Sequence, residues 1–101
     1  MLGKILLWVI IQTGGNMTEL EQWRNEIRAL DAQIKPLFLQ RLTLAQAIGR
    51  YKSEHGLPVY DPEREAQNRQ ALSADVSRTE KKAYEEFLQA VMTICRKAQE
   101  S

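Results

Sequence analysis

One apolar stripe through the first half of the sequence limits the folds that this chain can adopt. Between Thr18 and about Glu54, large apolar residues recur at steps of three, four or seven. They are Leu20, Trp23, Ile27, Leu30, Ile34, Leu37, Leu44 and Ile48. This spacing predicts an amphipathic helix of about 37 residues, roughly 55 Å long. Two short helices of the same chain cannot cover so long a stripe, so we expect it to pair with a second copy.

Residues typical of helix ends bound this first segment. Thr18 and Glu21 have the spacing of a capping box at its start. Gly56 and Pro58 follow its end, where glycine favours a helix-terminating turn and proline prevents continuation. Pro36 lies inside the segment and predicts a kink, because proline removes one backbone hydrogen bond. Two separate helices joined near Lys35 are the alternative.

Two further helices are predicted after this break. Asp61 is a favourable N-cap residue and Pro62 suits the first helical position, so a short helix should run from there to about Leu72. A connection follows to Thr79, and Ser77-x-x-Glu80 has the spacing of another capping box. A third helix should run to about Gln99, with one apolar side formed by Tyr84, Phe87, Leu88, Val91, Met92 and Cys95. Strand-like alternation is absent from the sequence, so the prediction is an all-α protomer with a long, a short and a long helix.

Composition excludes several classes of protein. Charged residues make up 27% of the chain and the formal net charge is only +1, which argues against a non-specific nucleic-acid binder. One cysteine and one histidine cannot form an internal disulfide or a four-ligand zinc site. Glycine-rich phosphate loops and metal-binding motifs are also missing, so we expect no cofactor and no metal. A reducing, cytoplasmic location is the default expectation.

Residues 1–16 differ from the rest and are treated as an N-terminal extension, with residues 17–101 as the helical domain. The extension holds a short apolar run from Ile5 to Ile11, too short to span a bilayer. It is either a non-essential extension or a segment that packs on the body. A secreted form with a signal peptide is a third interpretation, but no Ala-x-Ala-like cleavage site follows the run.

Cations occupy the apolar side of the first helix. Arg41 stands in a heptad position that is isoleucine at Ile27, Ile34 and Ile48. Lys52 lies eleven residues later, close to three full turns and about 16 Å away, so both side chains face the same way. A small anion between them would explain this placement, since an unpaired buried cation is costly. The alternative is that both side chains only extend their charged ends into water.

Arg24 and Gln99 add to this pattern. Gln99 follows Cys95 by four residues on the apolar side of the third helix, where its amide can donate a hydrogen bond. Arg24 precedes Arg41 by seventeen residues, roughly 25 Å along a straight helix and about 100° around it. One small ligand cannot contact both arginines of one chain, so Arg24 would have to come from an antiparallel second chain.

An ordered set of motifs carries a resemblance to a known family. LDAQI (30–34), QRLTLAQAIGRYK (40–52), VYDPERE (59–65) and the closing helix with Gln99 resemble the all-helical type of chorismate mutase, over about residues 20–99. The resemblance implies an isomerase that rearranges chorismate to prephenate in phenylalanine and tyrosine biosynthesis, without a cofactor. It also implies that the three-helix protomer forms an intertwined helical homodimer, in which one arginine of each site comes from the partner.

The same resemblance implies roles for individual residues. Arg41 and Arg24 of the second chain would hold the two carboxylates of the substrate. Lys52 and Gln99 would donate hydrogen bonds to its ether oxygen, so Lys52, Gln99 and Arg41 are the expected catalytic residues. The ring hydroxyl would contact Glu65 and the backbone near Asp61, and Arg64 would line the site.

Two residues depart from the family pattern, and other functions stay open. Cys95 stands where a small hydroxyl residue is expected, and a thiol is a poor hydrogen-bond donor. Pro36 lies within the first helix. Isochorismate-pyruvate lyase, a relative that uses a similar cationic pocket, is an alternative activity. A non-catalytic helical dimer is the alternative from another class of protein.

Overall fold

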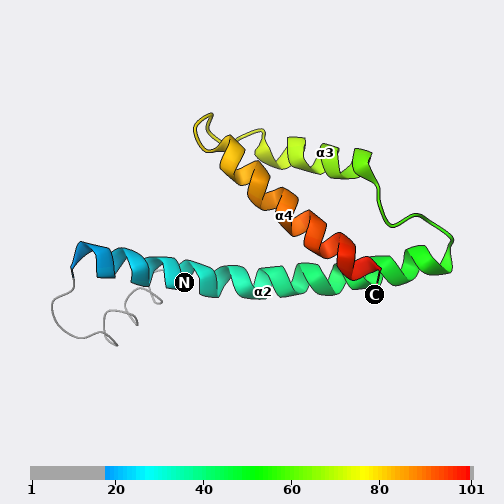
Figure 1. The fold of residues 1–101 in the computed structure, drawn as a ribbon, viewed down its shortest axis with the longest axis horizontal. Helices are drawn as coiled ribbons and strands as arrows, with labels where there is room; N and C mark the ends of the chain where they lie inside the picture. The colour runs from blue at the N-terminus through cyan, green and yellow to red at the C-terminus, as the bar shows by residue number, and fades with distance from the viewer. Residues whose placement is uncertain (1–17, 101) are drawn as a thin grey trace. The chain divides into compact units, whose positions relative to one another are not determined.

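The computed structural model describes residues 18–100, and its regular elements in that range are three helices. They are α2 (Glu19–Glu54), α3 (Pro62–Ser73) and α4 (Lys81–Gln99), labelled in Figure 1. The all-α class and the order long, short, long are therefore confirmed. In this part of the chain no helix combines the length and the apolarity that crossing a membrane requires. The interpretations of residues 1–16 lie outside the described residues.

The capping box predicted at the start of α2 is present. The backbone N–H of Thr18 donates to Glu21 Oε2 at 3.3 Å, and the backbone N–H of Glu21 donates to Thr18 Oγ1 at 3.2 Å. The helix then continues through Pro36 to Glu54, so the alternative of two helices joined near Lys35 is wrong. The kink at Pro36 stays a prediction.

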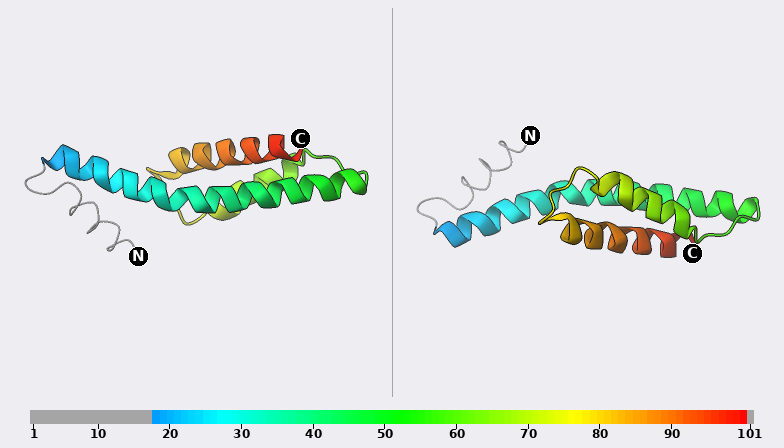
Figure 2. Two further views of the ribbon diagram at one scale, coloured as in Figure 1. Left: turned by 90° about the horizontal axis from the view of Figure 1, so that it is seen from below. Right: turned by 90° about the horizontal axis from the view of Figure 1, so that it is seen from above.

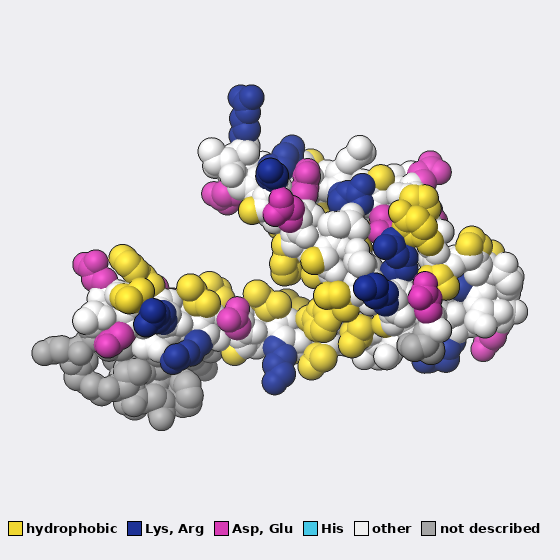
Figure 3. Space-filling model, in the orientation of Figure 1, with side chains coloured by type: hydrophobic (Ala, Val, Ile, Leu, Met, Phe, Trp, Pro, Cys, Tyr) yellow, Lys and Arg dark blue, Asp and Glu magenta, His cyan; other side chains and the backbone are white. Residues whose placement is uncertain are grey.

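Contacts group the chain into two compact units, Met1–Gln40 and Arg41–Ser101. The described part of the first unit is the N-terminal part of α2, whose apolar side chains form a row that is visible in yellow in Figure 3. Their exposed fractions range from 45 to 66% for Leu20, Trp23, Ile27, Leu30, Ile34 and Leu37. The second unit contains the C-terminal part of α2 with α3 and α4.

Within the second unit, α3 and α4 pack against each other (Figures 1 and 2). The apolar side of α4 that the sequence predicts is buried at Leu88, Met92 and Cys95. Arg69 of α3 donates to Gln89 Oε1 of α4 at 2.6 Å and links the two helices. Helices α3 and α4 are therefore held together by a side-chain hydrogen bond as well as by apolar packing.

Gly49 sets how closely the end of α4 approaches α2. A Cβ atom added to Gly49 would lie 2.5 Å from the carbonyl oxygen and 2.6 Å from the Cα atom of Gln99. Ordinary van der Waals contact begins at about 3.4 Å, so no larger residue fits at this position without a backbone shift. Because Gly49 has no side chain, the backbone of Gln99 can lie directly against α2.

The capping box expected at Ser77 and Glu80 is not formed. Helix α4 begins at Lys81, three residues later than a box with Ser77 as its N-cap requires, and Glu80 makes no side-chain capping bond. The carbonyl oxygen of Ser77 instead accepts the N–H groups of Glu80 at 3.1 Å and Lys81 at 2.9 Å. The backbone carbonyl of Ser77 therefore takes the Glu80 N–H that the Ser77 side chain would have accepted in a capping box.

The C-terminus of α2 has the glycine-terminated turn that the sequence predicts. Gly56 has a φ of 64°, the left-handed conformation that side chains disfavour. The N–H of Leu57 donates back to the carbonyl oxygen of Lys52 at 2.8 Å, as in a Schellman turn. This turn leads the chain into the loop that precedes α3.

Replacing Gly56 with Ala is expected to lower the free energy of unfolding by about 1 kcal/mol, the cost of left-handed backbone for a residue with a Cβ atom. No atom lies within 4 Å of that Cβ position, so a steric clash does not contribute. Urea unfolding at one fixed protein concentration measures the change. Gly56→Asn, which tolerates this conformation better, should lose less, and equal losses for the two variants would contradict the explanation.

Candidate functional site

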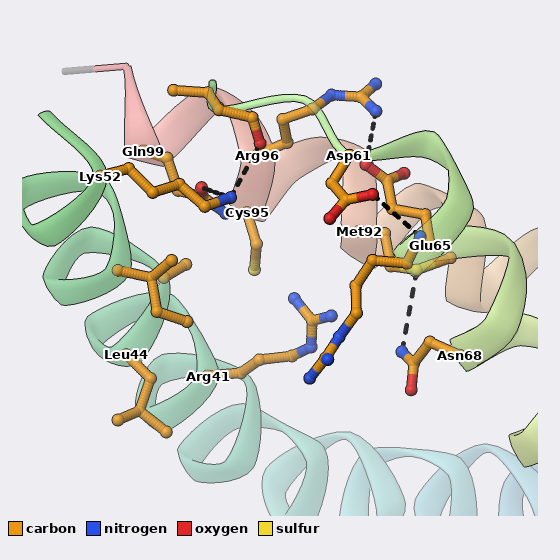
Figure 4. A pocket seen from close by; sticks show the side chains of 14 residues that line it. Arg41, Leu44, Lys52, Asp61, Glu65, Asn68, Met92, Cys95, Arg96 and Gln99 are labelled. Atoms are coloured by element: carbon orange, nitrogen blue, oxygen red, sulfur yellow. Dashed lines mark hydrogen bonds and ion pairs between the residues drawn. The ribbon is translucent and has the colours of Figure 1, made fainter. Parts of the chain in front are cut away.

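A cavity of about 530 Å³ lies within the second unit, where α2, α3, α4 and the loop before α3 meet. Its walls combine apolar and charged side chains, and Figure 4 shows them from close by. The lining residues are Arg41, Leu44, Ala45, Ile48, Lys52, Val59, Asp61, Arg64, Glu65, Asn68, Met92, Cys95, Arg96 and Gln99. Seven of the eight residues that the sequence predicts for the site are therefore brought together.

The charge of these walls favours an anionic ligand. Four lining residues are cationic and two are anionic, which gives the wall a net formal charge of +2. The cations are Arg41, Lys52, Arg64 and Arg96, and the anions are Asp61 and Glu65. Such an excess inside a partly enclosed cavity suits a small dicarboxylate, because charge-assisted hydrogen bonds to carboxylates are strong.

Lys52 and Gln99 form one hydrogen-bonding unit on the cavity wall. The ammonium Nζ of Lys52 donates to Gln99 Oε1 at 3.0 Å and to the carbonyl oxygen of Val59 at 2.9 Å (Figure 4). An ammonium has three protons, so one remains for a ligand. Because Lys52 can only donate, it fixes the oxygen of the Gln99 amide towards itself and leaves the NH₂ group of that amide available. Two donors can therefore meet one ligand oxygen.

Arg41 extends from α2 into the cavity (Figure 4) and is half-buried. Within residues 18–100 it has no carboxylate partner, since the ion pair found there joins Arg96 and Glu65. A half-buried guanidinium without a carboxylate partner is well placed to bind an anion through bidentate hydrogen bonds. The binding of a substrate carboxylate by Arg41 stays a prediction.

The start of α3 contributes Asp61 and Arg64. Asp61 is the N-cap residue, and its Oδ1 accepts the backbone N–H of Arg64 at 3.1 Å. The predicted N-cap of this helix is thereby confirmed. Both side chains are exposed and both line the cavity, so capping also fixes where these two charges sit.

The part of the chain that forms this cavity matches a known protein family. A family model for chorismate mutase type II matches residues 23–100, well over half of the chain. The chain belongs to the chorismate mutase type II family. The matched range includes the whole cavity wall, from Arg41 to Gln99.

Curated relatives match about half of the chain. The T-protein of Haemophilus influenzae is 47% identical over 49 residues, which cover 48% of this chain and 13% of that protein. The bifunctional chorismate mutase/prephenate dehydratase of Aquifex aeolicus is 45% identical over 49 residues, 48% of this chain and 14% of that protein. The 4-amino-4-deoxychorismate mutase of Streptomyces venezuelae is 41% identical over 46 residues, 46% of this chain and 45% of that protein. The aligned region is thus well under two thirds of each of these relatives. Among solved structures, none matches the chain.

Cys95 forms part of the wall of this cavity. It is only 2% exposed and its thiol is free. The side chain lines the cavity four residues before Gln99, one turn earlier on the same face of α4. Its place in the wall agrees with the sequence prediction, and its burial fits a small, weakly polar wall residue.

Arg24 is the one predicted site residue that this cavity does not include. It is exposed on the N-terminal part of α2, in the first unit, and is absent from the residues that line the cavity. The role of Arg24 in binding the substrate stays a prediction.

Arg96 is a site residue that the sequence analysis missed. Its Nη1 donates to Glu65 Oε2 at 2.7 Å, and its guanidinium lies 4.2 Å from the centre of the Tyr60 ring. A signal was present, because Arg96 precedes Gln99 by three residues and so shares its face of α4. The pairing with Glu65, 31 residues away in sequence, had no such signal.

Proposed function

We propose that this chain catalyses the rearrangement of chorismate to prephenate. The observation that supports this most is the family match over residues 23–100. This range contains all residues that line the cavity, whose wall carries a net formal charge of +2. The reaction is intramolecular, so the enzyme needs neither a nucleophile nor a cofactor. It needs to hold the reactive conformer of a dianion and to stabilise the charge that develops on its ether oxygen.

The donors on the wall fit these two tasks. Arg41 binds one carboxylate, and the free proton of Lys52 together with the NH₂ group of Gln99 meets the ether oxygen. Negative charge grows on that oxygen as the carbon–oxygen bond breaks, so both hydrogen bonds strengthen in the transition state. The contacts of Lys52 with Val59 and Gln99 hold the donors in place before the substrate arrives. Such preorganisation is the main source of the proposed rate enhancement.

The second carboxylate is assigned to Arg24 of a second copy of the chain, in a homodimer. Two observations support the dimer: the row of exposed apolar side chains on α2, and the position of Arg24 outside the residues that line the cavity. A patch of large apolar side chains along one helix is a typical interaction surface. Arg24 and Arg41 are seventeen residues apart on α2, too far for one small ligand to contact both in the same chain.

Subunit mixing tests this shared site. Arg24→Ala and Arg41→Ala homodimers should each lose most activity, because each of their sites lacks one arginine. Random exchange of the two subunits should restore about one quarter of the wild-type activity. Half of the dimers are then mixed, and one of the two sites in each mixed dimer is intact. Unfolding and refolding the mixture, followed by a rate measurement, gives the result. A mixture as inactive as its components would contradict the assignment of Arg24 to the second copy.

A second candidate substrate comes from the relatives. The Streptomyces venezuelae protein is named for 4-amino-4-deoxychorismate, which carries an amine where chorismate has the ring hydroxyl. The same wall donors would serve both compounds, because the dicarboxylate and the ether are shared. The two candidates therefore differ only in what the protein offers to the ring substituent.

A panel of three substrates distinguishes the possible activities. The purified full chain is incubated with chorismate, isochorismate or 4-amino-4-deoxychorismate, and the products are identified by mass spectrometry. We expect prephenate from chorismate as the main reaction. Release of pyruvate from isochorismate without prephenate formation would establish the lyase instead, and no turnover of any compound would leave a non-catalytic helical protein.

A further inference from the structure

The ion pair between Glu65 and Arg96 is placed where it can influence which ring substituent the site accepts. Both residues line the cavity, and their side chains are only 16% and 23% exposed. The pair joins α3 to α4, and Tyr60 from the preceding loop stacks on the guanidinium. In Figure 4 this pair lies on the side of the cavity away from Lys52 and Gln99. A substrate whose ether oxygen meets Lys52 and Gln99 therefore presents its ring substituent towards Glu65.

Arg96 changes what Glu65 can bind. A lone carboxylate in a partly enclosed cavity would attract an ammonium group, because the two charges are opposite and poorly screened there. With Arg96 at 2.7 Å, the charge of Glu65 is already compensated. Only Oε2 takes part in that ion pair, and Oε1 has no partner in residues 18–100. Oε1 can still accept a hydrogen bond from a neutral hydroxyl group.

We propose that Arg96 is a specificity-determining residue that makes the Glu65 wall select a neutral hydroxyl over an ammonium on the substrate ring. A primary aliphatic amine is largely protonated at neutral pH, so an amino substrate would bring a second cation to the Glu65–Arg96 pair. Its attraction to Glu65 would be offset by its repulsion from Arg96. A hydroxyl group meets no such repulsion. This inference rests on the proposed function and narrows its substrate class to chorismate-like compounds with a neutral ring substituent.

The test compares two substrates on the same variants. Kinetic constants for chorismate and 4-amino-4-deoxychorismate are measured with the wild type, Arg96→Met and Arg96→Lys, and the ratio of the two kcat/KM values is followed. Met keeps an unbranched stem that reaches about as far as Nε of Arg96, and it removes the guanidinium together with its charge and its contact with Tyr60. We expect Arg96→Met to shift the ratio towards the amino compound by about tenfold or more, the effect of one nearby charge in a partly buried site. Arg96→Lys, which keeps the charge, should stay within about threefold of the wild type.

A matched control separates charge from structure. Arg69→Met removes another arginine that links α3 to α4, at 2.6 Å from Gln89, but Arg69 does not line the cavity. It should leave the ratio unchanged, whatever it does to stability. A loss of folded protein lowers both kcat/KM values equally and also leaves the ratio unchanged.

Three results would overturn the inference. They are an unchanged ratio for Arg96→Met, equal shifts for the Met and Lys variants, and a wild type that prefers the amino compound. The last would keep the mutase activity and reject only the assignment of Arg96. Absence of turnover of both compounds by the wild type would reject the proposed function instead. In that case the ratio of the two equilibrium dissociation constants supplies the same comparison.

Discussion

Replacing Lys52 with Met is expected to lower kcat for chorismate by at least about 100-fold, the usual cost of removing a donor that acts in the transition state. The loss should exceed that of a single contact, because Lys52 also orients the amide of Gln99 through a 3.0 Å hydrogen bond. Without it, the amide oxygen can turn towards the substrate ether and repel it. Steady-state kinetics with chorismate measure the change, and the effect should fall on kcat more than on KM.

Arg50→Ala is the control for the Lys52 prediction. Arg50 is an exposed cation on the same helix and does not line the cavity, so its removal should leave kcat within about twofold. A Lys52→Met variant that keeps its fold by circular dichroism and its wild-type kcat would rule out the proposed role of the ammonium.

Replacing Gly49 with Ala is expected to destabilise the protein by about 1–3 kcal/mol and to reduce kcat by about 100-fold. The added Cβ would lie 2.5 Å from the backbone oxygen of Gln99, so the end of α4 must retreat by about 1 Å. A displacement of that size at a catalytic donor is enough for the predicted loss of rate. Urea unfolding and steady-state kinetics test the two parts separately.

The steric clash and helix propensity predict opposite signs for the change in stability of Gly49→Ala. Helix propensity alone predicts that Gly49→Ala stabilises the protein by about 1 kcal/mol, because alanine is the better helix former. A stabilised variant with unchanged kcat would therefore refute the steric argument. Ala47→Gly, at an exposed position of the same helix, is the matched control. It should cost about 1 kcal/mol through propensity and leave kcat unchanged.

Most of the fold could be predicted from local signals. The capping residues Thr18, Glu21 and Asp61 and the terminating Gly56 act within one turn of the chain, so their effects can be predicted without tertiary contacts. The long helix could be predicted for the same reason, from the regular spacing of its apolar residues. The start of α4 could not be predicted in this way, because a backbone turn at Ser77 competes with the side-chain cap.

The part of the candidate site that lies on a single helix could be predicted from helical geometry. Arg41 and Lys52 share one face of one helix, so their convergence followed from their spacing. The Glu65–Arg96 pair and the contact between Gly49 and Gln99 each join residues far apart in the sequence. They depend on how α3 and α4 pack, which no local pattern in one sequence specifies.

The proposed binding of the substrate can be observed in a crystal structure of the full chain with a bicyclic ether dicarboxylate that mimics the transition state. We expect the ligand to lie in the cavity, with its ether oxygen on Lys52 Nζ and Gln99 Nε2 and one carboxylate on Arg41. The other carboxylate should be bound by Arg24 of a second copy. A ligand bound elsewhere, or bound in this cavity of a monomer with its ether oxygen away from Lys52, would show that the proposed site is wrong.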